Sequence, residues 1–107
     1  MRYMLIRTHE TASIGGYDVN RGILASSTLQ SEIADKLKNI VEIAANDKRV
    51  EFINGIERDE FDLPIDFFNF LFGGFGVGND VVVEYYAEGM TIFNRATYSI
   101  MIEDGEI

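Results

Sequence analysis

Three hydroxyl side chains stand together where a helix is expected to begin. Ser26, Ser27 and Thr28 directly precede a stretch with helical periodicity. Free backbone N–H groups and the helix dipole attract anions at such an end. These hydroxyls are therefore candidates for binding a small anion or for being phosphorylated. Helix capping is the alternative explanation, because Ser27 and Gln30 have the spacing of a capping box.

Side chains that could do acid–base or metal chemistry do not form a known pattern. His9 is the only histidine, and no partner for a general base can be identified from the sequence. The carboxylates gather around an expected return strand, at Glu57, Asp59, Glu60, Asp62 and Asp66. They lack the spacing of a calcium-binding loop, which favours a solvated strand face over a metal or catalytic site. We expect no catalytic residue, no metal and no cofactor.

Large apolar residues are concentrated in one short segment, at Phe67, Phe68, Phe70, Leu71, Phe72 and Phe75. They follow Asp66, which is expected to cap a short helix. Such a helix buries only about three-sevenths of its surface against a core. Some rings should therefore form an interface with a protein partner or a second copy of the chain. The alternative is that the glycine-rich turn after the segment folds back and buries all of them.

The elements that must position these side chains begin with a helix. Apolar residues recur at steps of three and four, at Leu29, Ile33, Leu37, Ile40, Val41 and Ala44, and predict an amphipathic helix from about residue 28 to residue 46. Asn54-Gly55 is a strong hairpin signal, and predicts strands over residues 50–53 and 56–61. The charged return strand is expected to be exposed or at a sheet edge.

Further strands are expected over residues 3–7 and 81–86. Residues 8–20 are polar and contain Gly15-Gly16, which predicts a loop or an irregular hairpin. Residues 91–102 fit a helix and a strand equally well. The predicted fold is α+β, with an antiparallel sheet of about four strands and two or three helices on one face.

Length and charge exclude several classes of protein. The chain of 107 residues has room for one domain, 1–107. A formal charge of −9 gives no basic stripe for nucleic acid and disfavours an anionic membrane surface. Cysteine is absent, and the apolar run at the N-terminus is too short for a signal peptide or a membrane helix. We therefore expect a cytoplasmic protein whose partner is another protein or a second copy.

Two segments carry a resemblance to a known family. The first segment of this chain consists of Asn20, Arg21, Gly22, Ile23, Leu24, Ala25, Ser26, Ser27 and Thr28. It is similar to the Gly-Leu-His-Ala-Arg-Pro-Ala segment of the HPr phosphocarrier of the sugar phosphotransferase system. The second, residues 70–89, resembles the HPr stretch that leads through a glycine-rich turn into a strand ending Ala-Glu-Gly. The resemblance covers about the last three quarters of the chain and implies an HPr-like open-faced sandwich.

The departures from that family change the expected function. Leu24 stands at the position of the phosphorylated histidine, and Ser26 stands at that of the phosphate-holding arginine. Asp66 lies in the region of the family's regulatory serine. The resemblance therefore implies a regulatory or protein-interaction module without histidine phosphocarrier activity. A carboxylate-based metal-binding or enzyme domain and a structural homodimer without a ligand are the alternatives.

Overall fold

The computed structural model describes residues 1–13, 15–47, 49–57, 78, 80–86 and 93–103. Within them the chain forms six strands and one helix. In chain order these are β1 (Arg2–Ser13), β2 (Gly16–Ser27), α1 (Gln30–Asn46), β3 (Val50–Ile53), β4 (Ile56–Glu57), β5 (Val81–Tyr86) and β6 (Phe93–Glu103). The prediction of an HPr-like sandwich, with about four strands and two or three helices, is therefore wrong.

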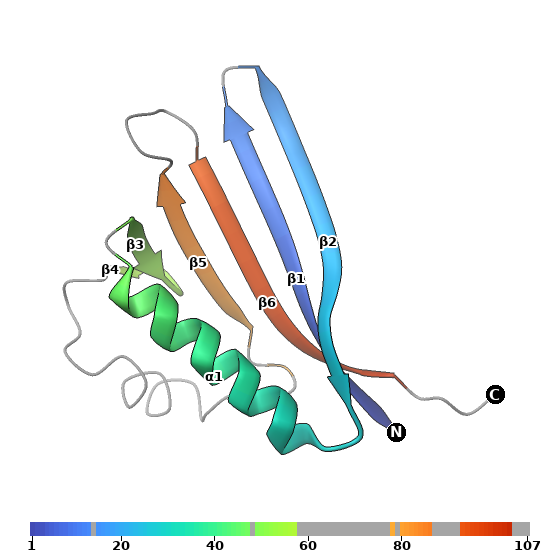
Figure 1. Cartoon of the computed structure of the whole chain (residues 1–107). Helices are drawn as coiled ribbons and strands as arrows, with labels where there is room; N and C mark the ends of the chain where they lie inside the picture. The colour runs from blue at the N-terminus through green and yellow to red at the C-terminus, as the bar shows by residue number, and fades with distance from the viewer. Residues whose placement is uncertain (14, 48, 58–77, 79, 87–92, 104–107) are drawn as a thin grey trace.

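All six strands join one antiparallel sheet in the order β2-β1-β6-β5-β3-β4. The last strand of the chain lies between the first strand and β5, so the middle of the sheet depends on contacts between residues far apart in the sequence. Figure 1 shows α1 across one face of the sheet, with the hairpin end of β1 and β2 extending beyond the helix. The two outer strands are β2 and β4.

The polar stretch after Arg7, predicted to be a loop or an irregular hairpin, is the second half of β1, and the strand that the prediction missed altogether is β2. The polar stretch continues as strand, pairing residue by residue with β2 and with β6 as far as Ala12. Thr8, for example, lies opposite Arg21 on one side and Thr97 on the other. Polar side chains are compatible with a strand whose backbone bonds are made on both sides, because burial of the side chain is not required there.

Helix α1 forms where the apolar periodicity predicted it, but it begins at Gln30. Ile33, Leu37 and Val41 are fully buried against the sheet. No side chain caps its N-terminus at Leu29, so the predicted capping box does not form. Instead the Ser27 hydroxyl accepts the Leu29 N–H at 3.0 Å and lies 2.6 Å from a Glu32 carboxylate oxygen, to which it donates.

The core joins the buried stripe of α1 to one face of the sheet. The sheet contributes Leu5, Val50, Ile53, Val81, Val83 and Ile100.

The predicted Asn54-Gly55 turn is confirmed, with φ values of 52° and 79° in the left-handed region. The short return strand β4 is at a sheet edge, as expected. Residues 91–102 fitted a helix and a strand equally well from their sequence. The described part of this segment lies in strand β6 (Phe93–Glu103), which pairs with β1 and β5.

Candidate functional site

A polar strip lies on the helix-facing side of the sheet. Successive side chains of a strand point to opposite faces, so the residues that follow the core residue Leu5 on its own side are Arg7, His9 and Thr11. The register sets Arg7 opposite Tyr98 and Thr11 opposite Asn94. The strip therefore starts at the edge of the core and runs toward the hairpin end of β1.

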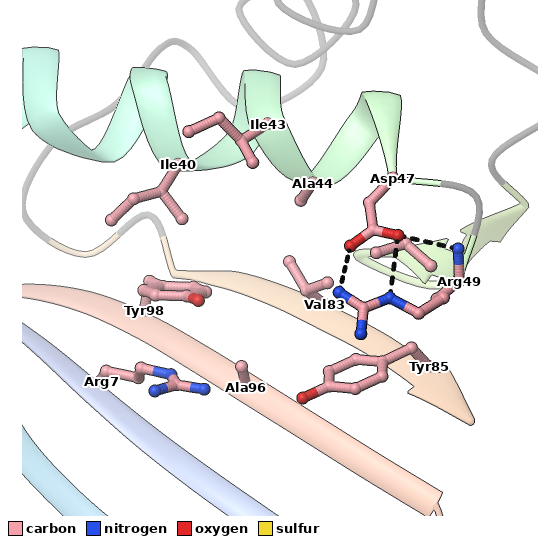
Figure 2. A pocket seen from close by; sticks show the side chains of 11 residues that line it. Arg7, Ile40, Ile43, Ala44, Asp47, Arg49, Val83, Tyr85, Ala96 and Tyr98 are labelled. Carbon is pink, nitrogen blue, oxygen red and sulfur yellow. Dashed lines mark hydrogen bonds and ion pairs between the residues drawn. The ribbon is translucent and has the colours of Figure 1, made fainter. Parts of the chain in front are cut away.

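A pocket of about 210 Å³ lies between the C-terminal half of α1 and this face of the sheet. We call it the Arg7 pocket. Its apolar lining consists of Ile40, Ile43, Ala44, Val50, Val83 and Ala96. Its polar lining consists of Arg7, Asp47, Arg49, Tyr85 and Tyr98. Figure 2 shows the helix residues above the pocket and the sheet residues below it.

Arg7 is the unusual residue of the pocket. The buried Nε of its guanidinium has no hydrogen-bond partner, and among the described residues no carboxylate forms an ion pair with it. By contrast, Arg49 donates to both carboxylate oxygens of Asp47. Its Nε lies 3.2 Å from one oxygen, and a terminal nitrogen lies 2.9 Å from the other. A buried donor without an acceptor is costly, about 1–3 kcal/mol. Arg7 therefore brings a cation to the lining of the pocket, although its Nε lies beneath the surface that the pocket exposes.

Two tyrosine hydroxyls share the space near Arg7. Figure 2 shows the Arg7 guanidinium and the Tyr85 hydroxyl pointing toward one another across the small side chain of Ala96, with the Tyr98 hydroxyl turned toward the same space. Burial raises the pKa of Tyr98 above its usual range, although the charge of Arg7 acts in the opposite direction. Tyr98 is therefore a neutral hydrogen-bond donor at physiological pH.

A second group of polar side chains, His9, Thr11, Tyr85 and Asn94, continues the strip; we call it the His9 cluster. The buried Asn94 amide oxygen accepts from the Thr11 hydroxyl at 3.2 Å and lies 3.2 Å from His9 Nε2. The donor and acceptor roles in the contact between His9 and Asn94 depend on the tautomer of His9. The Tyr85 hydroxyl lies 3.4 Å from His9 Nε2. His9 is thus a partnered strand residue, where the sequence suggested a surface loop.

A third feature is the outer edge of β2, which we call the β2 edge. All residues from Gly16 to Leu24 are exposed, and no described strand pairs with β2 on the side away from β1. The exposed large apolar residues of this stretch are Tyr17, Val19, Ile23 and Leu24. An exposed, long edge strand with apolar side chains is a template for pairing with another strand.

The predicted anion or phosphorylation site lies where β2 meets α1. Ser26 and Thr28 are exposed, while the Ser27 hydroxyl is held between Leu29 and Glu32. The Glu32 carboxylate would repel an anion placed at Ser27. Leu24, at the position expected for the phosphoacceptor, is an exposed residue of β2.

The remaining predicted site residues lie mostly outside the described residues. These are the helix cap Asp66 and the expected interface at Phe67, Phe68, Phe70, Leu71, Phe72 and Phe75, together with Asp59, Glu60 and Asp62. Glu57, the described member of the carboxylate group, is exposed on β4. Among the described positions, no three His, Cys, Asp or Glu side chains are grouped closely enough to hold a metal ion. The described part of the chain also has no helix long and apolar enough to cross a membrane.

The Arg7 pocket and the His9 cluster were both missed from the sequence. The signal that was available is the alternation Leu5-Arg7-His9-Thr11, which places four side chains on one face once the strand is extended beyond residue 7. Their partners Asn94 and Tyr98 are brought in by the pairing of β1 with β6. No local sequence pattern predicts the pairing of β1 with β6.

Comparison with known proteins identifies no relative: no family model, no curated protein and no solved structure matches this chain. The resemblance to the HPr family stays a prediction that these comparisons do not test, and the fold that it implied is not the one observed. Function must therefore be argued from the Arg7 pocket, the His9 cluster and the β2 edge.

Proposed function

We propose that this chain is a non-catalytic interaction module that binds through the β2 edge, and that its partner there is a second copy of the same chain. The observation that carries the proposal is the length and exposure of β2, a 12-residue outer strand. An interaction role was also predicted from the phenylalanine segment. The surface proposed here is a different one, built only from described residues.

The backbone of β2 supports strand pairing. In an antiparallel sheet, every second residue of an outer strand directs its N–H and C=O away from the neighbouring strand. Natural edges are often protected by proline, lysine or a very short strand. Between Gly16 and Ser27 there is no proline and no lysine, the strand is long, and its one irregularity, at Leu24, lies outside the segment from Tyr17 to Ile23. Pairing two such edges would join two six-stranded sheets into one continuous sheet.

The side chains of β2 are compatible with self-pairing. A two-fold axis through Asn20 would place Tyr17 opposite Ile23, an aromatic side chain against a β-branched one, which is a favourable cross-strand pair. The same register sets Val19 opposite Arg21. It also sets Asp18 opposite Gly22, so no like charges face one another. Pairing would partly cover three exposed apolar side chains on one face of the sheet. In the single chain these are Tyr17, Val19 and Ile23, which are 61%, 52% and 63% exposed.

Charge favours the β2 edge over other surfaces for self-association. Two copies of a chain with a formal charge of −9 repel one another. Within β2 the only charged residues are Asp18 and Arg21, which cancel. The approach of two β2 edges therefore brings together the neutral part of an acidic molecule.

Charge substitutions at Val19 test the proposed register. In a dimer centred on Asn20, Val19→Lys would face Arg21 twice and Val19→Glu would form two opposite-charge pairs. Each such pair is worth about 0.2–1 kcal/mol. Sedimentation equilibrium should show that Val19→Lys weakens dimerisation by about two- to thirtyfold and that Val19→Glu strengthens it.

The control is Ile43→Lys, because Ile43 is an exposed apolar residue in the C-terminal half of α1 and is not part of the β2 edge. This variant should dimerise like the wild-type chain. A wild-type chain that stays monomeric at concentrations of about 100 µM, well above common interface affinities, would contradict the proposal. So would equal weakening by all three substitutions.

A further inference from the structure

The charge of the Arg7 pocket differs from that of the whole molecule. Its charged lining residues are Arg7, Arg49 and Asp47, and the last two bind each other. The described lining residues therefore sum to a formal charge of +1, on a chain whose formal charge is −9. The positive charge of Arg7 attracts an anion into the pocket at short range, while the net charge of the whole chain opposes the approach of an anion from a distance.

The donors in the pocket match a carboxylate. The Arg7 guanidinium is a planar fork that binds a carboxylate through two parallel hydrogen bonds. The hydroxyls of Tyr85 and Tyr98 are turned toward the same space, over Ala96. A tyrosine hydroxyl, with an ordinary pKa of about 10, is protonated at neutral pH and can donate to a carboxylate. With a formal charge of +1 on its described lining, the pocket matches a monoanion better than a phosphate dianion.

The rest of the pocket is apolar and small. Ile40, Ile43 and Ala44 lie on the α1 side, and Val83 lies on the sheet side. The volume of about 210 Å³ is below the roughly 300–1,000 Å³ of pockets that hold drug-sized ligands. The ligand must therefore be compact, with one short apolar group beside its charge.

We infer that the Arg7 pocket binds a compact monocarboxylate, with its carboxylate on Arg7 and the two tyrosine hydroxyls and its apolar end against α1. The carboxylate would bind the part of the Arg7 guanidinium that lines the pocket, beside the Tyr98 hydroxyl. This inference does not depend on pairing at the β2 edge, because the pocket is formed by α1, β1, β5 and β6 together with the residues that follow α1.

The first test uses the wild-type chain with two probes of nearly equal shape. Benzoate and benzamide are titrated separately and followed by calorimetry and by the NMR signals of Tyr85 and Tyr98. Benzoate should bind and shift both tyrosines, and benzamide should bind at least about tenfold more weakly, as expected for loss of a charge-assisted pair. Inorganic phosphate should bind more weakly than benzoate. Equal binding of benzoate and benzamide, or no benzoate binding at millimolar concentration, would overturn the inference.

Variants then assign the binding to the pocket. Arg7→Gln should abolish the preference for benzoate over benzamide, and Tyr85→Phe, which keeps the ring, should weaken benzoate binding about three- to tenfold. The matched control is Arg2→Gln, an exposed arginine of the same strand that pairs with Glu103. It should bind like the wild type. If Arg7→Gln fails to fold, Tyr85→Phe decides: unchanged benzoate affinity in that variant would count against this site.

Discussion

At the scale of single residues, Arg7 connects the stability of the chain to its proposed ligand. The buried Nε of Arg7 has no acceptor within the described part of the chain, which costs about 1–3 kcal/mol. Such a cost is tolerated where a functional group must be ready to bind. Tyr98 lies directly opposite Arg7 in the register, so the two side chains share one polar environment between the helix and the sheet.

Tyr98 should make the fold sensitive to alkaline pH. Burial raises the pKa of its hydroxyl, so the folded state favours the neutral phenol. The resulting stabilisation is fully present below the unfolded pKa of about 10 and is lost as the pH rises through the higher folded pKa. Between about pH 8 and pH 11, the free energy of unfolding of the wild type should fall by more than that of Tyr98→Phe. Urea unfolding curves at several pH values measure both, and parallel falls would show that Tyr98 contributes nothing.

At the scale of elements, the turn between β3 and β4 ties the hairpin to the rest of the sheet. Asn54 is in the left-handed region with a φ of 52°, and its amide oxygen accepts the Val82 N–H at 2.6 Å. Its backbone N–H donates to the Val82 carbonyl at 2.8 Å. One residue therefore sets the turn and joins it to β5.

Asn54→Ala should destabilise the chain by about 1–3 kcal/mol, through loss of the side-chain bond to Val82 and the left-handed strain of alanine. Thermal and urea unfolding measure the change. Asn39→Ala is the matched control, because Asn39 is exposed in the middle of α1 and alanine favours helix. The control should leave stability unchanged or slightly higher. A loss of similar size in both variants would contradict the role given to the turn.

Elements specified by local patterns were predictable from the sequence. The stripe Ile33, Leu37 and Val41 predicted α1, and Asn54-Gly55 predicted the hairpin, because helix periodicity and turn conformation depend on neighbouring residues. The second half of β1 was missed, because its polar side chains carry no burial signal. Its structure depends on pairing with β6, more than eighty residues away along the chain.

The Arg7 pocket was not predictable for a related reason. Arg7 and Tyr98 come together only because β6 is inserted between β1 and β5. Their closeness also requires α1 to cover one side of the sheet. Local signals also predicted that the hydroxyls of Ser26, Ser27 and Thr28 open the helix, but Ser26 and Ser27 are the last residues of β2 and α1 begins at Gln30.

At the scale of the whole molecule, net charge opposes self-association and sheet topology favours it. The formal charge of −9 keeps copies apart, and the long β2 edge offers backbone groups for pairing. At physiological ionic strength charges are screened beyond about 8 Å, so the repulsion acts mainly at short range. An association through the neutral β2 edge is the arrangement that reduces this conflict most.

A disulfide at the two-fold axis tests that association most directly. The chain has no cysteine, so Asn20→Cys introduces a single thiol at the proposed axis. Directly opposite residues of antiparallel strands have Cα atoms about 4.5–5.5 Å apart, within the range that a disulfide spans. Under mild oxidation, Asn20→Cys should form a covalent dimer much faster than the exposed helix variant Asn39→Cys at the same concentration. Equal rates of cross-linking in the two variants would contradict pairing through the β2 edge.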